Sequence, residues 1–137
     1  LKLYESIHDK KGSATTLNNL GTFYSDLGQN KKALNYLKKS LQIKEEYSDP
    51  QDLAIAYNNL ANVYGLINDR KNELVYFQKA LDIREKLNDE QGVAATISDM
   101  SDIYFNEGQI EKALELNYQC LNFYRYLFRL QLLLHRY

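Results

Sequence analysis

The chain has 137 residues, 45% of them hydrophobic and 26% charged, which is typical of a folded globular protein. Its 17 basic and 18 acidic residues leave a net charge of −1, so the composition argues against nucleic acid or an acidic membrane surface as a partner. Cys120 is the single cysteine, which excludes an internal disulfide and a cysteine-based zinc site and favours a reducing, cytoplasmic compartment.

Residues forty positions apart carry matching side chains along most of the chain. Tyr24, Tyr64 and Tyr104, for example, occupy one position of this period. A fixed period of this length is typical of helix hairpins stacked into a solenoid, so we predict an all-α fold. Further matching sets are Leu34, Leu74 and Leu114; Leu41, Leu81 and Leu121; Ser40, Ala80 and Cys120; and Asp9, Asp49 and Asp89.

Residues 1–9 align with the last turns of the second helix of a repeat. We therefore expect the chain to begin inside a preceding repeat and to belong to a longer array. Asp9 is predicted to be the N-cap that starts the first complete repeat, residues 10–49, because an aspartate side chain accepts amide hydrogens of a first helical turn.

Within each repeat the apolar residues recur at i, i+3, i+4 and i+7, which predicts two amphipathic helices. In the first repeat the two stripes are formed by Leu17, Leu20, Gly21 and Tyr24, and by Leu34, Leu37 and Leu41. The predicted helices span about 10–27 and 30–47 in the first repeat, about 50–67 and 70–87 in the second (residues 50–89), and about 90–107 and 110–127 in the third (residues 90–127).

The helix ends carry recognisable signals. Asp49 and Asp89 are predicted N-caps, and Pro50 follows Asp49 at a first helical position, where its missing N–H costs nothing. Between the two helices of each repeat we expect a left-handed residue that ends the first helix. The residues at that position are Gly28, Asn68 and Gly108.

Two residues depart from the repeat pattern. Small side chains at Gly21 and Ala33 let paired helices approach closely, but the second repeat has Glu73 where the first has Ala33. We expect the Glu73 carboxylate to reach solvent or to find a partner, and the second repeat to be locally weaker. The third repeat has Asn117 at an apolar core position.

Residues 128–137 extend the last helix with a mostly apolar sequence. Its longest purely apolar run, Leu132–Leu134, is too short to span a bilayer. The segment is predicted to need a partner surface: the end of the stack, the next repeat, or a second copy of the chain. Self-association is the leading hypothesis, and its candidate residues are Tyr124, Leu127, Phe128, Leu130 and Leu133.

The order of Leu20, Gly21, Tyr24, Gly28, Ala33, Leu37, Ser40 and Leu41 resembles the tetratricopeptide repeat. The forty-residue unit looks most like the repeats of kinesin light chains and of mitotic-spindle adaptors. It also looks like bacterial repeats with an Asp-x-x-Gly turn, seen at Asp9–Gly12 and Asp89–Gly92, which often accompany sensor kinases or regulators. The resemblance implies a right-handed α-solenoid that binds a protein or peptide segment along its concave side.

By the same resemblance, the first helix of each repeat lines the concave groove. Asn18 and Asn58 are the leading candidates, because a primary amide offers a donor and an acceptor that complement a peptide unit. The alternatives are that these amides are solvated or tie neighbouring helices together; Asn19 and Asn59 are assigned to bracing. The candidate peptide-binding residues are Asn18, Thr22, Asp26, Asn58, Asn62, Leu66, Ser98, Asp102 and Phe105, flanked by Thr15, Ile55 and Ala95.

The groove positions include no lysine or arginine, and Asp26 and Asp102 would repel a free carboxylate. We therefore predict no binding of the C-terminal tails that some chaperone-binding members of the family clamp. We find no catalytic constellation, no phosphate-binding glycine loop and no metal-ligand spacing, so neither enzyme activity nor a cofactor is expected. The competing function is a structural or oligomerising segment of a larger sensor or regulator.

Overall fold

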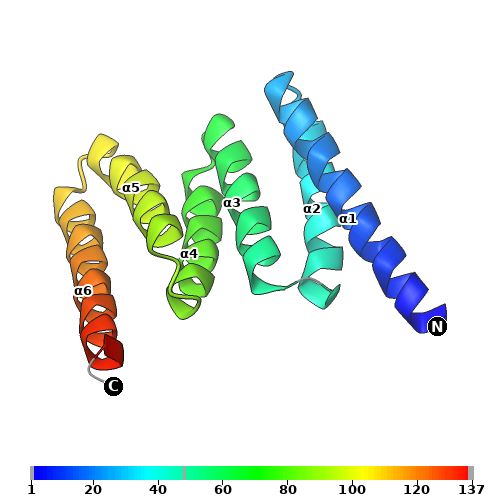
Figure 1. The fold of residues 1–137 in the computed structure, drawn as a ribbon. Helices are drawn as coiled ribbons and strands as arrows, with labels where there is room; N and C mark the ends of the chain where they lie inside the picture. The colour runs from blue at the N-terminus through cyan, green and yellow to red at the C-terminus, as the bar shows by residue number, and fades with distance from the viewer. Residues whose placement is uncertain (1, 48, 136–137) are drawn as a thin grey trace. The chain divides into compact units, whose positions relative to one another are not determined.

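A computed structural model describes residues 2–47 and 49–135, and these residues form six α-helices and no strand. Short turns join successive helices into hairpins (Figure 1). This confirms the all-α fold of antiparallel helix hairpins, while the right-handed twist stays a prediction. The helices are α1 (Lys2–Asp26), α2 (Asn30–Tyr47), α3 (Pro50–Leu66), α4 (Arg70–Lys86), α5 (Glu90–Asn106) and α6 (Ile110–His135).

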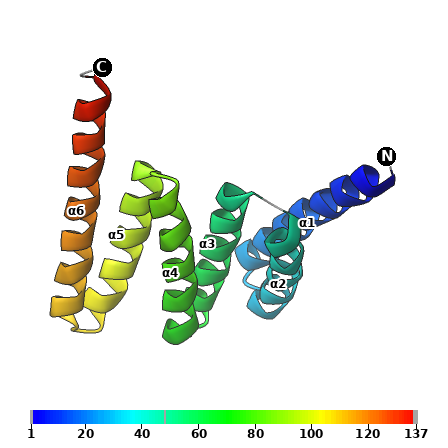
Figure 2. The same cartoon turned by 90° about the horizontal axis from the view of Figure 1, so that it is seen from below.

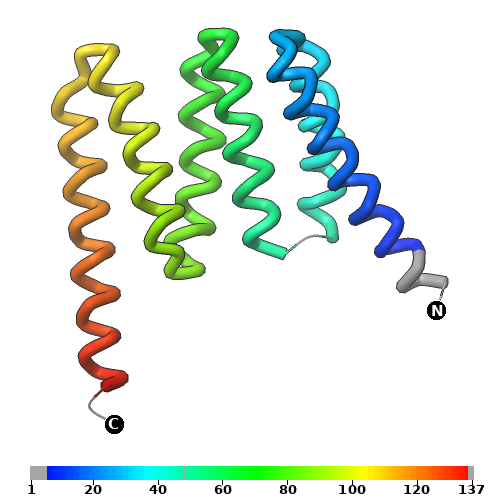
Figure 3. The backbone as a smooth tube through the Cα atoms, turned by 45° about the horizontal axis from the view of Figure 1, so that its top comes forward, coloured from blue at the N-terminus to red at the C-terminus, as the bar shows by residue number. Residues whose placement is uncertain are grey.

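The chain divides into two compact units, residues 1–80 and 81–137. In the first unit α1 packs against α2, and α3 packs against both of them. Figure 3 shows α1 and α2 side by side and antiparallel. In the second unit α5 and α6 form an antiparallel pair, which is seen clearly in Figure 2.

Four turns end their helices in the same way, with a left-handed residue and two backbone hydrogen bonds. At the first of them the Gly28 N–H donates to the Ser25 carbonyl (2.9 Å) and the Gln29 N–H donates to the Tyr24 carbonyl (2.8 Å). This pair of bonds is the Schellman motif, which satisfies carbonyls left unpaired at a helix end. The left-handed residues are Gly28 (φ 77), Asn68 (φ 60), Asn88 (φ 53) and Gly108 (φ 77), which confirms the three predicted positions and adds Asn88.

The predicted N-caps at Asp49 and Asp89 are confirmed. The Asp49 side chain accepts from the Asp52 N–H (3.0 Å), and that of Asp89 accepts from the Gly92 N–H (3.0 Å). Asp69 accepts from both the backbone (3.2 Å) and the side chain (2.7 Å) of Asn72, and these bonds lower the pKa of the Asp69 carboxyl. Aspartates therefore start three successive helices.

The helix start predicted at Asp9 is wrong, because α1 runs without a break from Lys2 to Asp26. The turn that ends α4 depends on a left-handed Asn88, whereas the position two periods earlier is His8, which lies inside α1. Without that reversal an aspartate has no free first turn to cap. At the other end of the chain, α6 continues past residue 127 to His135, and residues 136–137 lie outside the described part.

Small residues bring the helices of the first unit into close contact. A Cβ added at Gly21 would lie 2.5 Å from Leu37 Cγ, so the side chain of Leu37 rests on the bare backbone of α1. Ser40 is fully buried, and its hydroxyl donates to the Ala14 carbonyl (2.7 Å). A larger residue at either small position would push α1 and α2 apart.

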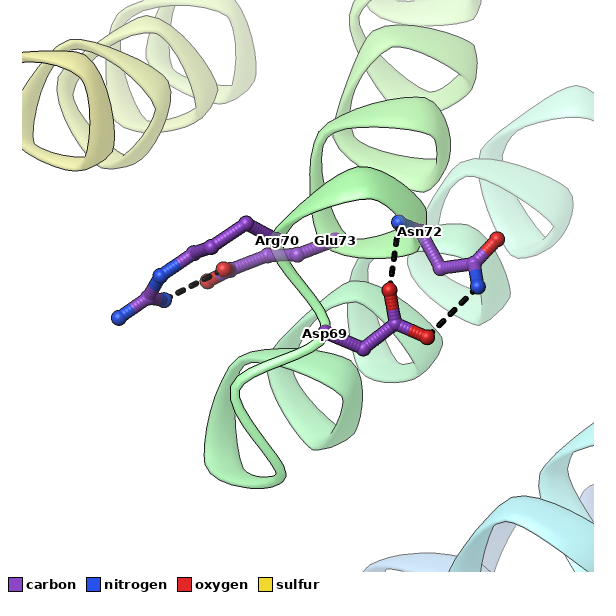
Figure 4. A network of polar contacts seen from close by, with 4 residues as sticks. All are labelled: Asp69, Arg70, Asn72 and Glu73. Atoms are coloured by element: carbon purple, nitrogen blue, oxygen red, sulfur yellow. Dashed lines mark hydrogen bonds and ion pairs between the residues drawn. The ribbon is translucent and has the colours of Figure 1, made fainter. Parts of the chain in front are cut away.

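Of the two predicted outcomes for Glu73, the structure shows an ion pair with a neighbouring residue and not exposure to solvent. Its carboxylate is buried and accepts from Arg70 Nη1 at 2.6 Å, one helical turn away (Figure 4). The room for it comes from Gly65 on α3, where an added Cβ would collide with the carboxylate. At this contact the second repeat therefore has its large side chain, Glu73, on α4 and its small residue, Gly65, on α3.

In the second unit α5 packs against α6, and polar contacts join both helices to residues 81–86 at the end of α4. Arg84 Nη1 donates to Thr96 Oγ1 (2.5 Å), and Gln119 Nε2 donates to Glu85 Oε1 (2.7 Å). The Thr96 hydroxyl in turn donates to the Gly92 carbonyl (2.7 Å). The buried apolar residues of the unit include Val93, Ile97, Met100, Leu116 and Leu127.

Candidate functional site

An open groove of about 380 Å³ lies between α1 and α3 in the first unit. Its walls come from the last two turns of both helices, where successive side chains at i, i+3 and i+4 face the same way. The residues that line it are Thr22, Ser25, Asp26, Asn59, Asn62, Val63 and Leu66.

The structure brings four of the predicted binding residues together in this groove: Thr22, Asp26, Asn62 and Leu66. Asp26 and Asn62 are exposed, and 59% of the Leu66 surface is accessible. A polar wall therefore stands beside an exposed leucine, which is the usual mixture of a site that orients a ligand with a few polar groups.

The side chain of Asn18, the leading candidate from the sequence, is hydrogen-bonded to a neighbouring helix. The Asn59 side-chain amide donates to Asn18 Oδ1 at 3.2 Å, so the pair ties α1 to α3 at the inner end of the groove. This is the bracing alternative that the sequence left open. Asn58 is half-buried and is not one of the residues that line the groove.

Sequence reasoning missed Ser25, Asn59 and Val63 as lining residues. The signal was present in the spacing, because Asn59, Asn62, Val63 and Leu66 follow i, i+3, i+4 and i+7 along one face of α3. The prediction named Asn58, whose side chain points about 100° around the helix from that of Asn59.

The groove offers hydrogen-bond acceptors and amides but no cation. The Thr22 hydroxyl donates to the Asn18 carbonyl (2.9 Å), which leaves the hydroxyl oxygen free to accept. Asp26 supplies an exposed carboxylate, and Asn62 supplies an exposed amide. This set suits a ligand that presents N–H groups, and it is unfavourable for a ligand carboxylate.

In the second unit, Ser98, Asp102 and Phe105 share one exposed face of α5, and Phe105 is 62% exposed. The pKa of nearby Asp99 is raised, first by burial and then by the charge of Asp102. This face therefore carries a concentrated negative charge beside an exposed aromatic ring.

The candidates for self-association divide into two groups. Phe128 and Leu133 are more than half exposed and Tyr124 is 37% exposed, as the hypothesis requires. Leu127 is only 8% exposed and contributes to the core of the second unit, and Leu130 is half-buried. We therefore leave Leu127 out of the proposed surface.

Three tyrosines form a stacked cluster between α3 and α4 in the first unit. Tyr76 lies between Tyr57 (centroids 5.9 Å apart) and Tyr64 (5.6 Å), and Lys79 covers two of the rings. The Tyr57 hydroxyl donates to Glu45 (3.0 Å), and burial followed by this bond raises the Tyr57 pKa to about 12. The rings are engaged with their neighbours, so the cluster is a packing feature of the unit.

The described residues give little support to a reactive cysteine, a metal site or a membrane-spanning helix. Burial and the Glu85 charge raise the pKa of the half-buried Cys120 thiol, which disfavours the reactive thiolate. Residues 2–47 and 49–135 contain no cluster of three or more side chains placed to hold a metal ion. Within the same residues, every helix is too short or too polar to cross a bilayer.

Comparison with known proteins gives a family match and matches among solved structures. The family model described as tetratricopeptide repeat matches residues 12–86, more than half of the chain. A search of curated proteins gave no match. Among solved structures, the crystal structure of BtubC (BKLC) from P. vanneervenii is similar, with a TM-score of 0.72 and 24% sequence identity over 83% of this chain and 47% of that one. The chain thus spans about half the length of that protein, and the likeness concerns the fold.

Proposed function

Because the chain belongs to the tetratricopeptide repeat family, whose repeats mediate protein–protein interactions, we propose that the groove between α1 and α3 binds an extended segment of a protein partner. The observation that carries this proposal is the convergence of Thr22, Asp26, Asn62 and Leu66 on one open groove. We also propose that this interaction takes place in the cytoplasm, since a chain with one cysteine suits a reducing compartment.

The proposed ligand is an extended strand of peptide. An extended backbone alternates N–H and C=O groups, and the Asn62 amide matches one such unit as donor and acceptor. Leu66 would cover an apolar side chain of the same strand, while the Asn18–Asn59 pair holds the two walls in register. Asp26 would favour a lysine or arginine on the ligand over an acidic residue.

The test uses short peptides with blocked ends, first screened on an array and then titrated by calorimetry. Replacing both Asn62 and Leu66 with alanine removes one polar and one apolar contact, so binding should weaken by about tenfold or more. Asn19→Ala is the matched control, because Asn19 is exposed on α1 and lies outside the groove. Equal binding by the double variant and the wild type would rule out this groove.

A second candidate function is self-association through α6, and a separate observation favours it. Apolar residues along α6 are exposed from its first turn to its last, among them Leu114, Leu121, Phe128 and Leu132, each more than half accessible. Monomeric proteins rarely leave such a continuous apolar strip uncovered.

A further inference from the structure

The groove between α1 and α3 lies where both of these helices end. Asp26 is the last residue of α1 and Leu66 is the last residue of α3, and both side chains line the groove. The two helices end on the same side of the first unit (Figure 1). Because the C-terminal end of a helix carries a partial negative charge of about half an elementary charge, each helix adds negative potential where the exposed Asp26 carboxylate already stands.

The groove contains no cation that would offset this potential. The last turns of α1 and α3 hold no basic residue, whereas the last turn of α2 holds Lys44. Asp26 has no ion-pair partner among the described residues. Four basic residues follow these two helix ends in the chain, but they belong to the next helices and do not line the groove: Lys31, Lys32, Arg70 and Lys71.

Two of these four basic residues are engaged elsewhere. Lys32 Nζ lies over the Tyr24 ring, 5.3 Å from its centroid, and Arg70 forms the ion pair with Glu73. A negative charge at the C-terminal end of a helix is also unfavourable for the helix itself. A cation supplied by a ligand at Asp26 would therefore relieve a local repulsion as well as form an ion pair.

From these charges we infer that the occupant of the groove is a basic segment of the partner. In this extended segment a lysine or arginine pairs with Asp26, and an apolar side chain two residues away packs on Leu66. The inference rests on the proposed function and deepens it, since it names the chemistry that the groove selects.

The spacing of the two ligand side chains follows from the positions of Asp26 and Leu66. These residues are forty apart, which is one period of the sequence, so they occupy the same level on neighbouring helices. Packed helices have axes about 8–10 Å apart. Side chains two residues apart on a strand point to the same face and are separated by about 7 Å, and the flexible stem of a lysine covers the difference. Side chains of adjacent residues point to opposite faces, so only one of them would enter the groove.

The second unit, taken by itself, carries the same chemistry on α5. The last turn of α5 also holds no basic residue, and Asp102 and Phe105 are exposed on one face of this helix. Asp102 follows Asn62 by forty residues, so a carboxylate replaces the amide that lines the groove of the first unit. A carboxylate beside a ring that is 62% exposed suits a cation, because the face of an aromatic ring attracts positive charge.

The test compares four peptides with acetylated and amidated ends, each titrated into the isotope-labelled chain and followed by NMR. The first is Lys-Thr-Leu-Thr-Lys, whose symmetry presents the same spacing in both directions of the strand. The second has acetyl-lysine at both lysine positions, which removes the positive charges, and the third has glutamate there. The fourth, Thr-Lys-Leu-Lys-Thr, keeps the composition and charge of the first and changes only the spacing.

We expect the first peptide to bind at least about threefold more tightly than each of the others, which is the size of effect that an exposed ion pair gives. Added salt should reduce its advantage over the acetyl-lysine peptide, because exposed charges are screened. Asp26→Asn should remove that advantage, and Asp26→Lys should make the glutamate peptide bind more tightly than the lysine peptide. Asp9→Asn is the matched control, because Asp9 is exposed on α1 outside the groove, and this variant should keep the wild-type preference.

Each contrary result has a distinct meaning. Equal binding of the lysine and acetyl-lysine peptides by the wild type would overturn the inference and leave the proposed groove standing. A preference for lysine that survives in Asp26→Asn would also overturn it, and equal binding of the first and fourth peptides would disprove the spacing. If none of the four peptides binds, the basic segment is excluded, whereas the proposed function is decided separately by the array screen and the Asn62 and Leu66 double variant.

Discussion

The carboxylate of Glu73 on α4 lies directly over the bare Cα of Gly65 on α3. In the first and third repeats the position of Glu73 holds Ala33 and Ala113, while that of Gly65 holds Ser25 and Phe105. The second repeat therefore keeps its helices close by placing the small residue on the other helix. The glycine at position 65 is therefore explained by Glu73, and the buried Glu73 is explained by Gly65.

This exchange predicts strong coupling between the two positions. Gly65→Ala alone should gain little, because the better helix propensity of alanine, about 1 kcal/mol, is offset by contact with Glu73. With Glu73→Ala also in place the contact disappears and the gain should be realised in full. The free energy of unfolding in urea, measured for both single variants and the double variant, should show a coupling of roughly 0.5–3 kcal/mol. Additive effects would mean that the two side chains do not compete for the same space.

Two glycines of α1 should respond in opposite ways to alanine. A Cβ at Gly21 would meet Leu37, so Gly21→Ala should destabilise the first unit by roughly 1–3 kcal/mol. A Cβ at Gly12 would meet nothing within 4 Å, so Gly12→Ala should stabilise the helix by about 1 kcal/mol. Thermal unfolding followed by circular dichroism gives both values, and shifts of the same sign would contradict the close approach of α1 and α2 at Gly21.

A free carboxylate on a peptide ligand should weaken its binding to the groove. Asp26 is exposed there and no lysine or arginine lines the walls, so a terminal carboxylate meets repulsion and no cation. Calorimetry with an amidated peptide and its free-acid form should favour the amide. Asp26→Asn should narrow the difference in affinity between the two peptides, and tighter binding of the free acid by the wild type would contradict the proposed repulsion by Asp26.

The raised pKa of Tyr57 makes the stability of the first unit sensitive to high pH. The phenol ionises at about 12 in the folded state, against an ordinary value of 10.0. Its contribution is fully present below pH 10.0 and is lost as pH rises toward 12, because the unfolded chain releases this proton first. Tyr57→Phe should make the decline in unfolding free energy shallower across that window.

The turns could be predicted from sequence because each depends on a local property. Gly28, Asn68 and Gly108 tolerate the left-handed conformation, and Asp49 and Asp89 reach the next turn with their own side chains. Asp9 shows the limit of such signals. A capping residue starts a helix only where the chain has already reversed, and at His8 it continues straight on.

The groove was harder to predict because it depends on how two helices face each other. The family resemblance pointed to Thr22, Asp26, Asn62 and Leu66, and these four residues line the groove between α1 and α3. It could not show that Asn59 would reach across to Asn18, since a hydrogen bond between residues 41 apart is decided by the angle between helices. The burial of Leu127 within an otherwise exposed apolar segment has the same origin.

The uninterrupted course of α1 has a consequence for backbone amide hydrogen exchange. Residues 8–13 are all exposed, and Lys10 Nζ donates a hydrogen bond to the Tyr47 hydroxyl on α2 (3.1 Å). With Gly12 in its middle, this stretch depends on its own helical bonds and should open and trade its protons with solvent long before the rest of α1. The amide exchange rate of residues 8–13 therefore reports whether another molecule lies along this stretch. Such a contact would slow the exchange without altering the helix.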